Sequence, residues 1–120
     1  MPIAGFPIGN TVVATGAVTA PGALGLITSI AAASLPAGTY QVVAKVWYGA
    51  TAGAENDMII NAGGTQIGQF IIDAVATNNN PVTIEFIRNL DGATNLNIQA
   101  VGGAAGVYKA YIEATKIRGG

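Results

Sequence analysis

The strongest constraint on this chain is an alternation of apolar side chains near its middle. Residues 39–49 read TYQVVAKVWYG. Successive side chains of a β-strand point to opposite faces. One face would carry Tyr40, Val42, Ala44, Val46 and Tyr48, and the other Gln41, Val43, Lys45 and Trp47. The first set predicts a core face, and the second is half apolar and carries the only tryptophan of the chain.

Further β-favouring segments recur at roughly the 8–12-residue spacing of an antiparallel sandwich or barrel. They lie at residues 11–19, 24–32, 57–61, 65–73, 82–88, 95–101 and 107–117. Turn signals separate them, with a hairpin turn expected at 62–64 and loops at 77–81 and 102–106. No stretch has the period of an amphipathic helix, and residues 31–34 allow a single helical turn at most. The chain is therefore predicted to be all-β, with about seven or eight strands.

The same alternation predicts which side chains enter the core. The inward residues would be Val82, Ile84, Phe86, Leu96, Ile98, Ala100, Ala110, Ile112 and Ala114.

The first ten residues, MPIAGFPIGN, contain two prolines and two glycines around three apolar side chains. Proline excludes a helix and disfavours a central strand there. We expect an irregular arm whose Ile3, Phe6 and Ile8 dock on a neighbour, with a frayed terminus as the alternative. One domain fits this length, divided into an arm with the first strand (1–20) and a β-sandwich (21–120).

Charge is scarce, with five basic and six acidic residues and a net charge of −1. An average domain has about 25% charged residues, and this one has 9%. No basic surface favours nucleic acid or anionic lipid. The most apolar window, residues 17–35, is interrupted by Pro21, Gly22 and Gly25, which argues against a membrane helix. We expect neither nucleic acid nor membrane as a partner.

The residue types needed for common catalysis are missing. The chain has no cysteine and no histidine, which removes the usual ligands of zinc, iron and copper and the usual bases. Its six carboxylates are scattered over predicted turns and solvent faces. The sequence therefore predicts a protein that is not an enzyme and has no cofactor or metal.

Several strands have a second face that is too apolar to face water. We expect Val43, Trp47, Ile87, Tyr111 and Ile117 to form a subunit interface, because such cores are aromatic and poor in charge. Two alternatives remain. Residues 1–20 could fold back over this face, or aromatic residues could stack on sugars, with Trp47, Tyr48, Tyr108 and Tyr111 as candidates.

Two segments carry a family resemblance. Residues 35–40, LPAGTY, followed by an alternating strand, resemble the opening of a jelly-roll module of the tumour-necrosis-factor or C1q type. Residues 108–117, YKAYIEATKI, are similar to its last strand. The resemblance covers residues 35–118, without the collagen-like or coiled-coil stalk that often precedes such modules. It implies an antiparallel jelly-roll sandwich of about eight strands with an extended N-terminal arm.

Modules of this kind occur as trimers in bacteriophage capsid decoration proteins and fibres. The resemblance and the charge-poor composition together predict a virion protein, made in the host cytoplasm and placed on the capsid surface. We expect a homotrimeric capsid decoration (cement) protein that contacts the major capsid protein through Ile3, Phe6 and Ile8. The alternative is a carbohydrate- or receptor-binding jelly-roll module, such as a fibre tip or a lectin-like protein.

Overall fold

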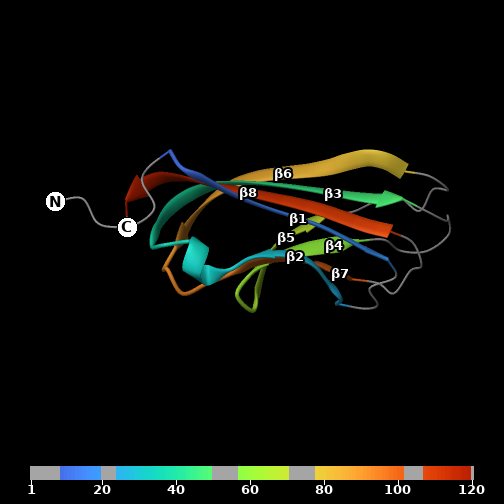
Figure 1. The fold of residues 1–120 in the computed structure, drawn as a ribbon, viewed down its shortest axis with the longest axis horizontal. Helices are drawn as coiled ribbons and strands as arrows, with labels where there is room; N and C mark the ends of the chain where they lie inside the picture. Colours follow the sequence, from blue (N-terminus) through green and yellow to red (C-terminus); the bar gives the residue numbers. More distant parts are fainter. Residues whose placement is uncertain (1–8, 20–23, 50–56, 71–77, 102–106, 120) are drawn as a thin grey trace.

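The computed structural model describes residues 9–19, 24–49, 57–70, 78–101 and 107–119. Within them the chain forms eight β-strands and one short 3₁₀ helix, arranged as two layers (Figure 1). The elements are β1 (Thr11–Thr19), β2 (Leu26–Ile30), η1 (Ala32–Ser34), β3 (Gly38–Gly49), β4 (Met58–Ala62), β5 (Thr65–Phe70), β6 (Asn78–Leu90), β7 (Leu96–Ala100) and β8 (Val107–Gly119).

The strand order is that of a jelly roll. The first sheet has the order β1-β8-β3-β6 and the second β2-β7-β4-β5. All pairings are antiparallel, and the chain crosses repeatedly between the sheets, as in two interlocked Greek keys. The expected all-β jelly-roll sandwich is confirmed.

The core lies between the two sheets, where their inner faces meet. The inner side chains of β3 and most of those of β7 and β8 have no exposed surface, and Val82, Ile84 and Phe86 of β6 pack against them. A fully buried aliphatic or aromatic side chain contributes about 1.5–3 kcal/mol to folding. The inward residues predicted from alternation are confirmed, except that the side chain of Tyr48 lies outside the description.

The turn before β3 is stabilised by a buried side chain and by a hydrogen bond within the turn. Leu35 is fully buried, and the Tyr40 hydroxyl donates a 2.6 Å hydrogen bond to the backbone oxygen of Pro36. Burial raises the pKa of Tyr40 above its ordinary value. The segment thus anchors the beginning of β3 from both sides of the turn.

The hairpin between β4 and β5 forms at the predicted turn, where Gly63 has a φ of 61°. The loop predicted at 77–81 is wrong, because β6 begins at Asn78 and includes Pro81. β6 lies at the edge of its sheet, where proline is tolerated since one side of the strand has no partner. The register also shifts there, between Val46 and Tyr48 of β3.

Strands β1 and β2, which belong to different sheets, approach closely at Gly16. A Cβ atom on Gly16 would lie 2.0 Å from the backbone oxygen of Ile27, and real Cβ atoms do not approach that closely. Ile27 is the extra residue of a bulge in β2. Position 16 therefore requires glycine.

Substitution of Gly16 tests this contact. Gly16→Ala should lower the free energy of unfolding by about 1–3 kcal/mol, the usual cost of overpacking, measured by urea denaturation. Gly64→Ala is the control, because nothing lies within 4 Å of its Cβ position. Equal stability of the two variants would contradict the close approach.

Candidate interaction face

The outer face of the first sheet is the side of β1, β8, β3 and β6 that points away from the core. The strand registers order its side chains in rows across the sheet. The central rows are Thr11–Thr115–Gln41–Ile87, Val13–Glu113–Val43–Glu85, Thr15–Tyr111–Lys45–Thr83 and Ala17–Lys109–Trp47.

Large apolar side chains are exposed on this face. Val13 is 49% exposed and Ile87 is 67% exposed, while Val43, Trp47 and Tyr111 are partly exposed. The register places on this one face four of the five residues predicted at a subunit interface: Val43, Trp47, Ile87 and Tyr111. The fifth, Ile117, lies in a β-bulge at the far end of β8 and is 41% exposed.

Charged side chains lie among the apolar ones, and two of them, Lys45 and Glu113, contact Tyr111. The Lys45 ammonium lies 5.6 Å from the centre of the Tyr111 ring, within the range of a cation–π contact. The Tyr111 hydroxyl donates a 2.7 Å hydrogen bond to the Glu113 carboxylate.

That hydrogen bond, with burial and the negative charge of Glu113 adding to it, raises the pKa of Tyr111 above its ordinary value. Because the pKa is raised, the hydrogen bond from Tyr111 to Glu113 stabilises the fold fully below about pH 10, and this contribution is lost as the pH rises through the folded-state pKa of Tyr111. Tyr111 is therefore neutral and held in place at physiological pH.

A shallow hollow of about 340 Å³ lies between Trp47 and Tyr111. The small residues Thr15, Gly16 and Ala17 of β1 form part of its lining, together with Lys109 and Ala110 of β8. Small side chains beside two aromatic ones leave room for a flat group to rest on the sheet. Among the aromatic residues proposed to stack on sugars, Tyr108 is ruled out because it is fully buried, and the side chain of Tyr48 is outside the description.

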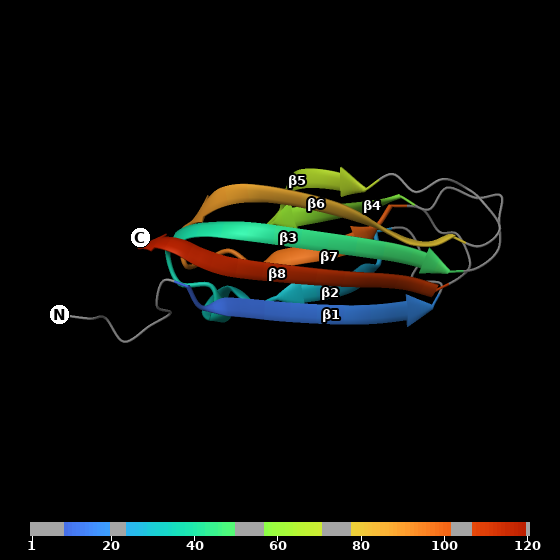
Figure 2. The ribbon, with the colours of Figure 1, turned by 90° about the horizontal axis from the view of Figure 1, so that it is seen from above.

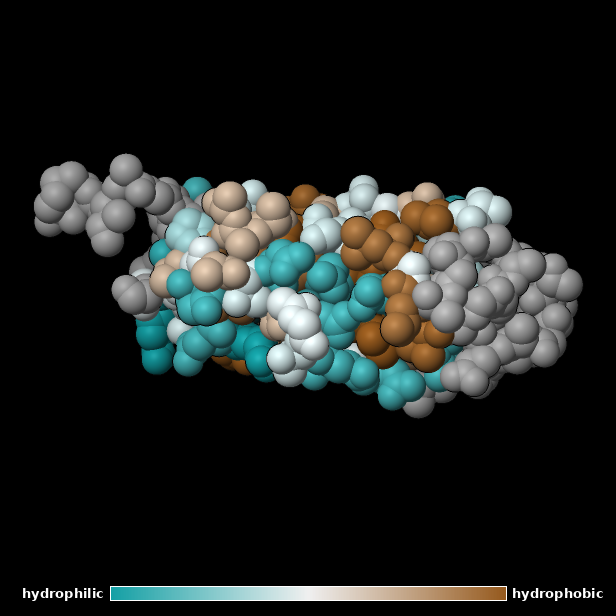
Figure 3. Space-filling view, turned by 90° about the horizontal axis from the view of Figure 1, so that it is seen from below, coloured by the Kyte–Doolittle hydropathy of each residue, from teal (hydrophilic) through white to brown (hydrophobic). Residues whose placement is uncertain are grey.

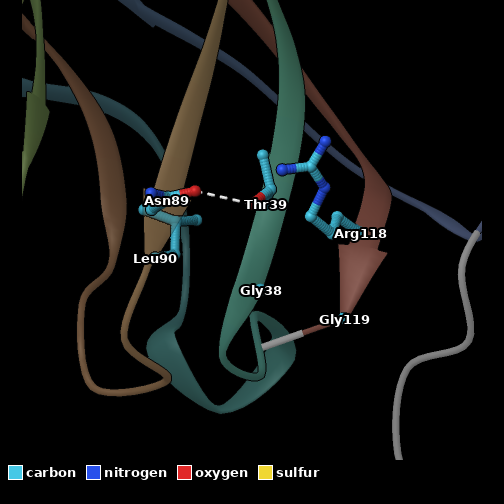
Figure 4. A pocket seen from close by; sticks show the side chains of 6 residues that line it. All are labelled: Gly38, Thr39, Asn89, Leu90, Arg118 and Gly119. Atoms are coloured by element: carbon cyan, nitrogen blue, oxygen red, sulfur yellow. Dashed lines mark hydrogen bonds between the residues drawn. The ribbon is translucent and has the colours of Figure 1, made fainter.

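A second hollow, of about 310 Å³, lies at the end of the sheet where β3 begins (Figure 4). The Thr39 hydroxyl donates a 2.5 Å hydrogen bond to Asn89 Oδ1, and the Arg118 side chain extends beside Thr39. No sequence pattern marks this polar site, because Thr39, Asn89 and Arg118 come from three strands that only the sheet order makes neighbours.

The outer face of the second sheet is different in character. Figure 3 views the molecule from this side and shows a broad hydrophilic surface beside a hydrophobic patch. Asn61 donates a hydrogen bond to the Gln99 side-chain oxygen, and Gln99 donates one of 3.0 Å to the Leu24 backbone oxygen. Within the described chain, Asn97 Oδ1 is buried and has no hydrogen-bond partner. Amide groups rather than charges thus cover much of this sheet.

The predicted capsid contacts Ile3, Phe6 and Ile8 lie outside the described residues. Residues 11–19, one part of the segment expected to cover the outer face, instead pair with β8 as an edge strand. Residues 11–19 therefore do not cover that face.

In the described segments, no group of three or more acidic residues is placed to hold a metal ion.

None of the helical structure among the described residues is long and apolar enough to cross a membrane.

Solved structures share this fold. The vertex protein P5 of PRD1 aligns over 92% of this chain and 99% of its own, with 12% identity and a TM-score of 0.58. The C-terminal CBM6 module of LamC, a marine laminarinase from Zobellia galactanivorans, aligns over 89% of this chain and 100% of its own, with 16% identity and a TM-score of 0.54. No protein-family model matches the chain, and a search of curated proteins finds no match.

At these identities the likeness is one of fold. It supports a jelly-roll-like sandwich. It does not support the narrower resemblance to the tumour-necrosis-factor and C1q type, and that part of the expectation is withdrawn. The fold itself is compatible with both a structural and a carbohydrate-binding role, since function depends on sites.

Proposed function

We propose that this protein is a structural component of a phage virion, a capsid decoration protein whose copies associate through the outer face of the first sheet. The observation that carries the proposal is the exposure of Val13, Val43, Trp47 and Ile87 on one face. Monomers rarely leave such a group of apolar side chains in water. The fold likeness to a phage vertex protein over nearly the full length of both chains supports the choice.

We expect three copies to associate around a common axis, as jelly-roll modules of decoration proteins do. Tyr111 lies on the inner strand β8 and Trp47 near the end of the inner strand β3, and both would serve as aromatic anchors of the kind found in interface cores. Glu113 and Lys109 lie on β8 in the same rows as Val43 and Trp47, so the contact would include these two charges. A trimer would then present three N-terminal arms to the major capsid protein, with Ile3, Phe6 and Ile8 as the contacts. Bound copies would stabilise the closed shell by mass action.

Replacing Trp47 tests the association. Trp47→Ala should weaken the trimer by about 2 kcal/mol or more if the residue is a hot spot, measured as the dissociation constant from light scattering over a dilution series. Leu26→Ala is the matched control, because Leu26 is 53% exposed on the other sheet. A dissociation constant unchanged in Trp47→Ala would remove Trp47 from the interface.

Deleting residues 1–8 tests the arm. The deletion should abolish cosedimentation with capsids of the encoding virus while the sandwich keeps its unfolding midpoint. Gly9 and Asn10 must stay, because both make backbone hydrogen bonds with Lys116, of 2.7 Å and 3.1 Å. A triple change of Ile3, Phe6 and Ile8 to serine should act like the deletion. Capsid binding that survives both would exclude the arm as the contact.

The hollow between Trp47 and Tyr111 favours a second candidate function, carbohydrate binding. A pyranose ring could rest on the two aromatic side chains, with Thr15 and Lys109 offering hydrogen bonds. The likeness to a CBM6 module supports this reading at the level of fold.

The two functions are separated by a titration of Trp47 fluorescence with soluble polysaccharides, laminarin among them. Carbohydrate binding predicts a saturable change that Tyr111→Ala abolishes and Leu26→Ala preserves. The absence of any change, together with a trimer in solution, would leave the structural role.

A further inference from the structure

One edge of strand β1 has no partner among the described strands. Among these strands β1 pairs only with β8, and Figure 2 shows it at the margin of the molecule with no described strand beyond it. Its register with β8 runs unbroken from Thr11 to Thr19. Its sequence, TVVATGAVT, has no charge and no proline. A long, regular and uncharged edge is a template for adding another strand.

The other three sheet edges have features that discourage such pairing. β6 contains Pro81 and the charged residues Glu85 and Arg88. β2 and β5 are short, with five and six residues, and each is interrupted by a bulge. Against these internal comparisons, β1 is the exception in the described part of the sandwich.

The unpaired backbone groups of β1 can be assigned. The Lys116 N–H donates to the backbone oxygen of Asn10 over 3.1 Å, which fixes the phase of the ladder. Hydrogen-bonded and non-bonded pairs alternate along an antiparallel pair. The N–H and C=O groups of the odd-numbered residues therefore point away from β8: those of Thr11, Val13, Thr15, Ala17 and Thr19.

The sequence of β1 is nearly the same in both directions about Thr15. We propose that β1 pairs with β1 of a second copy, antiparallel, about a two-fold axis through Thr15. Thr11 would then lie opposite Thr19, Val12 opposite Val18, and Thr15 opposite itself. This register pairs odd residues with odd ones, so the free backbone groups meet as hydrogen-bonded pairs. Matched threonine pairs add to the stability of such a ladder.

Charges beside the edge are complementary in this arrangement. Glu113 adjoins Val13, and Lys109 adjoins Ala17. Since Val13 would lie opposite Ala17 of the second copy, one row would hold Glu113 of one copy and Lys109 of the other. Glu113 and Lys109 in this row would be about 14 Å apart, across three strand spacings. The two-fold axis would repeat this pair of opposite charges on its other side. A parallel pairing, or a register moved by two residues, would lose this match.

This contact is distinct from the association through the outer face. It uses the edge of the sheet and a two-fold axis, whereas the proposed trimer uses the face. It would join one trimer to the next, and it can form whether or not the trimer does.

Cysteine substitution tests the register, because the chain has no cysteine of its own. Thr15→Cys should form a disulfide-linked dimer on mild oxidation, since opposed residues in such a pair lie within the range of a disulfide. Thr11→Cys alone should stay monomeric on a denaturing gel, because its own counterpart would be about 27 Å away along the strands. An equal mixture of Thr11→Cys and Thr19→Cys should cross-link.

The experiment is repeated in the Trp47→Ala background, where the face contact is weakened. Cross-linking of Thr15→Cys that persists there supports the edge contact independently of the trimer. Thr15→Pro gives a second readout, because it removes two inter-copy hydrogen bonds and none to β8. It should weaken edge association about tenfold or more at an unchanged unfolding midpoint. Cross-linking of Thr11→Cys equal to that of Thr15→Cys, or none at all in Thr15→Cys, would overturn the proposal.

Discussion

The structure depends on the complete burial of one face of β3. Tyr40, Val42, Ala44 and Val46 have no exposed surface, and β3 hydrogen-bonds to β8 on one side and β6 on the other. A shift of the register by one residue would turn this whole set toward water. The register in which β3 pairs with β8 and with β6 is therefore fixed by the same alternation. The side chains on the outer face are therefore fixed too, because the residues before and after each inward residue of a strand point outward.

Much of the fold could be predicted because alternation is local. The bounds of β1 follow from its β-favouring residues and the turn signal after them, and the inward residues of β3, β7 and β8 follow from period two. The same rule already places Tyr108 on the side of Ala110 and Ile112, and applying it would have excluded Tyr108 as a sugar platform. The error at 77–81 has another cause. Proline is tolerated in β6 only because β6 is an edge strand, and edge position depends on the order of strands far apart in sequence.

The candidate sites show the same limit. The sequence could place Val43, Trp47, Ile87 and Tyr111 on the outward faces of their strands. Their arrangement in rows depends on the register between strands, which the sequence does not show. The contact of Lys45 with Tyr111, and the polar hollow at Thr39, Asn89 and Arg118, join strands that are distant along the chain. The close approach of Gly16 to Ile27 is a contact between sheets, which no single-strand pattern contains.

The proline and the charges of β6 have a consequence for the size of assemblies. Edge-to-edge contacts that join unlike edges repeat without limit and produce fibres, whereas a contact between like edges closes on itself. Here the far edge of the first sheet is blocked by Pro81, Glu85 and Arg88. A sheet extended at β1 therefore ends at β6 of each copy. A chain with so little charge to keep its copies apart is in this way protected against polymerising edge to edge, in the direction perpendicular to its strands.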